Sequence, residues 1–163
     1  MEVRRDERGA ALLEFTVVLP VLLAIGLGVF EFGNLIYNYH LIGTGVRDAA
    51  RFVAGLPTID ENGNSLRTQN DEAAINIAMR GTADTSGELR VPWWSNTATV
   101  SVVYTDHSNV DGSGNQLYRG GDVITTVTVA AEVPYQALGF LGYLGLGNIT
   151  LSSQHEERVF GVR

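Results

Sequence analysis

An acidic side chain inside a long apolar run is the feature of this sequence best suited to chemistry. Glu14 is the only charged residue between Ala10 and Phe30. A carboxylate within a membrane segment is costly and tends to mark function. A subunit that packs by this segment against copies of itself has a use for the charge, whereas a secretory signal or a plain anchor has none. The alternative is a carboxylate near the membrane face that simply stays hydrated.

The element that must position Glu14 is a helix preceded by a charged leader. The apolar run has about the length that a helix needs to cross a bilayer. Arg4, Arg5 and Arg8 precede it and favour a cytoplasmic N-terminus, with the rest of the chain outside the cytoplasm. Three interpretations remain open: a cleavable secretory signal, a signal anchor, and a short leader cut between Gly9 and Ala10. No small-x-small cleavage site follows the run, which argues against the first.

Several segments of the sequence resemble those of a known protein family. Gly9, four apolar residues, Glu14 and the aromatic Phe15 resemble the prepilin peptidase site of type IV pilins. The longer segments that carry the resemblance are Arg8–Phe15, Leu19–Leu23 and Val46–Phe52. They resemble the TadE-like proteins, which are minor pilins or pseudopilins of the tight-adherence (Tad) pilus system. The resemblance implies that a membrane peptidase cuts after Gly9, and that Glu14 pairs with the N-terminal amine of a neighbouring subunit during assembly.

The resemblance also implies a division of the chain and a set of partners. We expect a prepilin-type leader (1–9), a transmembrane and assembly helix (10–33), a helix extension (34–55) and an extracytoplasmic α+β domain (56–163). The implied function is that of a structural minor pilin that helps to assemble, prime or cap a pilus for surface adherence. Its partners would be other pilin subunits, the prepilin peptidase, the inner-membrane assembly platform and the bacterial inner membrane. The alternative is a non-polymerising, membrane-anchored binding domain.

Periodicity predicts the remaining elements. One helix is expected over 10–54, ended by Gly55, with Gly43 and Gly45 as a weak point and with Glu31 and Asn34 marking the outer membrane interface. A short helix should follow, capped by Asn70 and ended by Arg80 and Gly81. Alternating β-branched residues predict strands over 99–105 and 123–133, and a third strand over 149–160. The expected fold is α+β and pilin-like: a long N-terminal helix packed on a small antiparallel sheet.

Four residues and one segment are candidates for partner contacts. Arg47 and Arg51 share one helix face, which is either solvated or in contact with an acidic surface of a partner pilin. Of Trp93 and Trp94, one ring should pack in the core and the other cover an edge, or else contact a partner. The apolar, glycine-rich segment 135–147 is either buried against the sheet or an exposed patch for a partner subunit or the outer membrane leaflet.

Composition narrows the remaining function classes. The net charge of -7 argues against a nucleic-acid partner, and the absence of cysteine excludes thiol catalysis. The three histidines, His40, His107 and His155, lie in no catalytic or metal motif, so we expect neither an enzyme nor a cofactor. Two loops carry oxygen ligands with the reach of a calcium loop but without its sixth-position glycine or final glutamate. These weak calcium candidates are Asp60, Asn62, Asn64, Asp71, Asp111, Ser113, Asn115 and Asp122.

Overall fold

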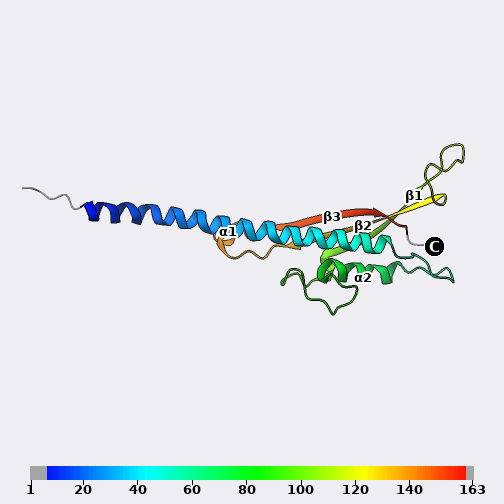
Figure 1. The fold of residues 1–163 in the computed structure, drawn as a ribbon, viewed down its shortest axis with the longest axis horizontal. Helices are drawn as coiled ribbons and strands as arrows, with labels where there is room; N and C mark the ends of the chain where they lie inside the picture. The colour runs from blue at the N-terminus through cyan, green and yellow to red at the C-terminus, as the bar shows by residue number, and fades with distance from the viewer. Residues whose placement is uncertain (1–6, 161–163) are drawn as a thin grey trace, which may run out of the picture.

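One helix runs through most of the length of the molecule, and everything else packs around its C-terminal half. In the computed structural model, which describes residues 7–160, helix α1 spans Glu7–Ala54 (Figure 1). Its end agrees with the prediction, because Gly55 and Pro57 stop the helical pattern. Pro20 lies inside α1 without ending it. The helix also continues unbroken through Gly43 and Gly45, so the expected weak point there is wrong.

A three-stranded antiparallel sheet packs on α1. Its strands β1 (Val100–Ser108), β2 (Val123–Pro134) and β3 (Thr150–Arg158) lie in the order β1-β2-β3. Val127, Val129, Ala131 and Val133 of the central strand are buried together, as the period of two along a strand requires. The sheet and the long helix confirm the predicted α+β fold.

A second helix completes the layer on which the sheet lies. Helix α2 spans Arg67–Arg80 and ends at Gly81, whose left-handed φ of 79° makes it the expected stop. Its start was predicted wrongly: α2 begins three residues before Asn70. The Asn70 side chain is buried and donates to the Pro57 carbonyl at 3.0 Å, so it joins the preceding loop to the helix instead of capping it.

The core lies between α1, α2 and the sheet. Ile42, Val46, Ala49, Ala50 and Val53 form the buried face of α1. The single-turn helix η1 (Thr97–Thr99) leads into β1, and the short helix α3 (Phe140–Tyr143) lies in the connection between β2 and β3. This connection runs back along α1 toward its N-terminal half, as the orange segment in Figure 1 shows. The connection therefore extends further toward the N-terminus of α1 than the sheet does.

Candidate functional site

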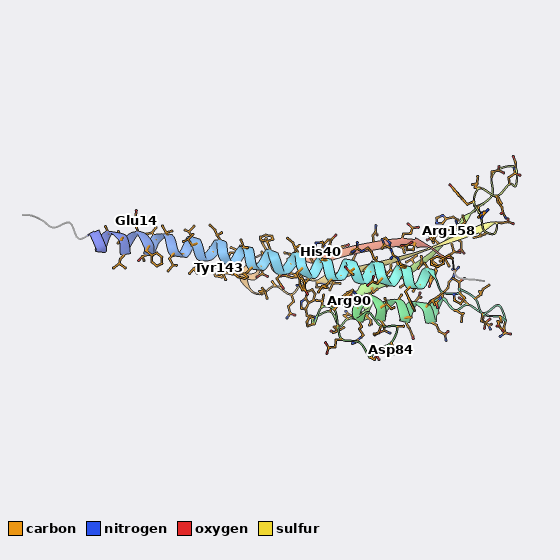
Figure 2. All side chains as sticks on the ribbon, in the orientation of Figure 1. Glu14, His40, Asp84, Arg90, Tyr143 and Arg158 are labelled. Atoms are coloured by element: carbon orange, nitrogen blue, oxygen red, sulfur yellow. The ribbon has the colours of Figure 1, made fainter. Side chains whose placement is uncertain are left out.

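The N-terminal half of α1 projects alone beyond the rest of the chain. Between Gly9 and Phe30 no residue is buried, and Figure 2 shows Glu14 on this projecting part. Among the described residues, one helix, within Gly9–Ala54, is long and apolar enough to cross a membrane. Glu14 and the neighbouring Phe15 are both exposed. A contiguous exposed apolar surface of this length marks a site of interaction with a membrane or with other proteins.

The predicted cut site lies at the start of this helix. Gly9 and Ala10 are both exposed and belong to α1, which begins at Glu7. Residues 1–6 of the expected leader lie outside the described residues. The peptide bond between Gly9 and Ala10 thus lies near the N-terminal end of α1, and Ala10 is four residues before Glu14.

A second carboxylate on α1 has the opposite environment. Glu31 is 1 % exposed. Its Oε1 accepts hydrogen bonds from the Tyr135 hydroxyl at 3.1 Å and the Leu138 amide at 2.8 Å, and its Oε2 accepts from the Phe140 amide at 3.2 Å. Asn34 donates to the Tyr135 oxygen at 2.8 Å. We call this set the Glu31 clamp: Glu31 and Asn34 on α1, with Tyr135, Leu138 and Phe140 of the β2–β3 connection.

The clamp holds its tyrosine in the protonated form. Burial, together with the neighbouring Glu31 carboxylate, raises the pKa of the Tyr135 phenol above its usual 10.0, although the Asn34 amide acts the other way. A phenol that keeps its proton goes on donating to the carboxylate. Sequence reasoning placed Glu31 at the outer interface but did not find its partners, because two of them are backbone amides, which leave no signal in the residue types.

The apolar segment 135–147 combines the two alternatives that the sequence left open. Tyr135 and Leu141 are buried, whereas Leu138, Tyr143, Leu144 and Leu146 are exposed. Figure 2 shows Tyr143 beside α1, on the side of the domain nearer to Glu14. The segment is therefore anchored by a few side chains and presents the others outward.

The structure places Arg47 at a groove between α1 and β3. This groove, of about 320 Å³, is also lined by Tyr39, His40 and His155. Arg47 donates to the Thr44 hydroxyl at 3.3 Å. Within residues 7–160, no carboxylate lies in salt-bridge range of Arg47 or of the exposed Arg51. Within the described part of the chain, both guanidinium groups are therefore available to a partner.

One of the two tryptophans packs in the core, as predicted. Trp94 is buried, and its indole N–H donates to the Thr99 hydroxyl at 2.8 Å. Trp93 is partly buried and meets the Tyr135 ring edge-on, with centroids 6.0 Å apart. Trp93 thus supports the Glu31 clamp from the domain side.

The two calcium candidate loops fold as matching turns at the end of the molecule opposite the N-terminal end of α1 (Figure 1). Asp60 accepts from the backbone amides of Asn62 and Asn64, and Asp111 accepts from those of Ser113 and Asn115, all at 2.8–2.9 Å.

These hydrogen bonds determine the acidity of both loops. The side-chain and backbone N–H groups of Asn64 lower the pKa of Asp60, and the Asn115 and Ser113 amides lower that of Asp111. The last candidate of each loop lies in a different setting. Asp71 lies on α2, where burial raises its pKa, and the carboxylate of Asp122 accepts from Gln116. Across residues 7–160 no group of three or more acidic or histidine side chains is placed to hold a metal ion.

Comparison with known proteins identifies the N-terminal part of the chain. Residues 9–51 match the family model of the TadE-like proteins, which confirms, for this part of the chain, the resemblance seen in the sequence. That family is structural and not enzymatic. No curated protein and no solved structure shows significant similarity to the chain.

Proposed function

On the premise that residues 9–51 are TadE-like, we propose that the chain is a minor pilin that is built into a Tad pilus through α1. The observation that carries the proposal is the bare half of α1, from Gly9 to Phe30, with Glu14 as its only charge. Such a helix suits a membrane before assembly and a bundle of like helices afterwards. The domain around the other half of α1 would stay outside the cytoplasm and face the other pilin subunits.

Processing after Gly9 would create the partner that Glu14 lacks. Cleavage by a prepilin peptidase leaves Ala10 with a free, positively charged amine in an apolar environment. Pairing this amine with Glu14 of a neighbouring subunit offsets two desolvation costs at once. Because the pair forms only at one axial offset, it also fixes the register between subunits. The inner-membrane assembly platform would then extract the subunit for priming or capping the pilus.

N-terminal sequencing of the membrane-extracted protein tests the first step. The mature chain is expected to begin at Ala10 when the host's prepilin peptidase is present, and at Met1 when it is absent. A mature chain that still begins at Met1 in the presence of the peptidase contradicts the proposal. It would favour a membrane-anchored binding domain that does not polymerise.

The second step is tested by Glu14→Ala, with Thr16→Ala as the matched control. The Thr16 hydroxyl donates within the helix to the Leu12 carbonyl, so its loss leaves a helix of the same length and nearly the same polarity. We expect Glu14→Ala to be processed and inserted normally but to be absent from sheared pili, whereas Thr16→Ala is recovered in them. Equal recovery of both variants would remove Glu14 from the assembly mechanism.

A further inference from the structure

The β2–β3 connection reaches a level of α1 that belongs to its membrane-length part. The ring of Phe140 lies against Gly28, where an added Cβ would be 3.5 Å from it. Phe32 of α1 lines a small pocket together with Leu141 and Leu146 of the connection. These contacts place the connection beside residues 28–32 of α1. This level of the helix is well N-terminal to Ile42, the first residue of α1 that belongs to the apolar core.

The length of α1 sets where the membrane should end. A helix rises about 1.5 Å per residue, so roughly 20 residues cross the hydrocarbon core. Counted from Ala10, where the apolar run begins, that distance ends close to Phe30. If α1 crosses the membrane from Ala10, the connection that packs on Gly28 and Phe32 lies at the outer boundary of the membrane and not above it.

The surface of the connection suits this level. Residues 133–154 contain no Asp, Glu, Lys, Arg or His. Four large apolar or aromatic side chains point outward from it, and Tyr143 is 88 % exposed. They are Leu138, Tyr143, Leu144 and Leu146. Tyrosine is enriched at membrane–water boundaries, where its ring is apolar and its hydroxyl stays wet.

The Glu31 clamp explains how a charge is tolerated at this depth. A carboxylate facing lipid would be strongly disfavoured. Here the connection covers Glu31 and supplies three donors to it, two of them backbone amides. The connection thus turns three hydrogen-bond donors toward Glu31, while its four large exposed side chains remain open to the surroundings. That is the arrangement expected of a loop that borders lipid.

We propose that residues 138–146, here called the apolar tip, insert into the outer leaflet of the membrane beside α1. The proposal rests on the membrane insertion of α1 that the proposed function requires. The occupant of the surface is the acyl and headgroup boundary of phospholipids, because the tip continues the apolar surface of the helix without an intervening charge. The tip would fix the depth and tilt of the subunit before its assembly into a pilus.

Single-cysteine labelling of the full chain can test this, since the protein has no cysteine of its own. Leu144→Cys reports on the tip, and Leu117→Cys, in the β1–β2 loop at the far end, is the aqueous control. Ile25→Cys on α1 is the membrane control. The three parent side chains are similarly exposed, at 53 %, 57 % and 60 %, so differences between labels reflect location and not burial in the protein.

The nitroxide-labelled chains are reconstituted into vesicles of phosphatidylethanolamine and phosphatidylglycerol. Their collision rates with oxygen and with a water-soluble nickel complex are then compared. The proposal predicts that the oxygen-to-nickel ratio at Leu144→Cys is several-fold above that at Leu117→Cys and approaches that at Ile25→Cys. Leu146→Cys should repeat the result at a second position of the tip.

Two results would overturn the proposal while leaving α1 in the membrane. In the first, the tip label is as open to nickel as the Leu117→Cys label, although Ile25→Cys is shielded. In the second, the tip label is shielded only at high protein-to-lipid ratio, which would assign the surface to another copy of the chain. If Ile25→Cys is itself open to nickel, the membrane insertion of α1 fails and the proposal falls with it.

Discussion

Glu14 and Glu31 are two carboxylates on one apolar helix, and their surroundings give them different roles. Glu14 is exposed on the bare half of α1, and we propose that its partner comes from a neighbouring subunit. Glu31 is buried and receives three donors from within the chain. The first is suited to assembly and the second to holding the β2–β3 connection in place. Only the second role can be tested on an isolated subunit.

Replacing Glu31 by alanine should destabilise the domain. The change leaves the Tyr135 hydroxyl and the amides of Leu138 and Phe140 without their acceptor in a buried place. With a cost of about 1–3 kcal/mol for a buried group left unpaired, partly relieved by local rearrangement, we expect a loss of roughly 2–4 kcal/mol in the free energy of unfolding. Urea unfolding in detergent measures it, with tryptophan fluorescence as the signal because Trp93 contacts Tyr135.

A conservative variant and a control variant accompany this measurement. Glu31→Gln keeps one oxygen acceptor and should lose about half as much as Glu31→Ala. Glu61→Ala removes an exposed carboxylate from a loop and should change the unfolding free energy little. The clamp would be energetically unimportant if Glu31→Ala unfolded at the same urea concentration as Glu61→Ala.

The acid dependence of the Asp111 loop follows from its depressed pKa. Amide donors from Asn115 and Ser113 lower this pKa below the ordinary 3.8, so the folded loop binds fewer protons than the unfolded chain near that pH. The contribution of Asp111 to stability is therefore complete above pH 3.8 and is lost as the pH falls through the folded value. Amide chemical shifts of Ser113 and Asn115 should titrate with a midpoint below 3.8.

Asp111→Asn separates the hydrogen bonds from the charge. An asparagine oxygen can still accept from both amides but does not titrate in this range, so the two shifts should become independent of acid. The matching Asp60 loop serves as an internal control, because its Asn62 and Asn64 amides should titrate as before. A wild-type midpoint at or above 3.8 would show that the turns do not hold their carboxylates in the charged form.

At the scale of elements, the contact between α1 and α2 depends on one missing side chain. A Cβ added at Gly45 would come within 2.1 Å of the Ala78 carbonyl oxygen, which is a backbone atom of α2 and cannot rotate away. Gly45→Ala should therefore separate the two helices and lower the unfolding free energy by about 1–3 kcal/mol or more. Thermal unfolding followed by far-ultraviolet circular dichroism measures this loss.

Gly26→Ala is the control for the same change on the same helix. Nothing lies within 4 Å of a Cβ built at Gly26, so the extra methyl meets no neighbour. Its melting temperature should stay close to that of the wild type. If Gly45→Ala were as stable as Gly26→Ala, the close approach of α1 and α2 would not be needed for the fold.

Several elements could be predicted from the sequence because their signals are local. The apolar run and the stop at Gly55 define α1, and the alternating β-branched residues define β1 and β2. The start of α2 was predicted wrongly because asparagine is a common helix cap. In the fold, the Asn70 side-chain amide instead donates a hydrogen bond to the Pro57 carbonyl, thirteen residues earlier. The Glu31 clamp was missed for a similar reason. Its donors lie more than a hundred residues away along the chain, and only the fold brings them together.

At the scale of the whole molecule, α1 has a bare half and a covered half, and Glu31 marks the boundary. No residue between Gly9 and Phe30 is buried, whereas the buried residues run from Glu31 onward. The fold of the domain should therefore not depend on the bare half. The TadE-like match begins in the bare half but continues to residue 51, so it also covers core residues such as Ile42 and Val46.

Two truncated chains test this boundary. A fragment that begins at Gly28 keeps Glu31 and Asn34, whereas one that begins at Leu35 loses both while keeping every buried residue of the apolar core. Both fragments should fold, and in the same mild detergent the shorter one should melt roughly 5–15 °C lower, because it lacks the acceptor for three donors. Differential scanning calorimetry gives the two melting temperatures.

Introducing Glu31→Ala into the longer fragment should reproduce most of the difference, since the shorter fragment otherwise loses only exposed or half-buried side chains. Equal melting temperatures for the two fragments would show that the Glu31 clamp does not contribute to the stability of the isolated domain. The β2–β3 connection would then pack on α1 only in contact with a membrane or a neighbouring subunit.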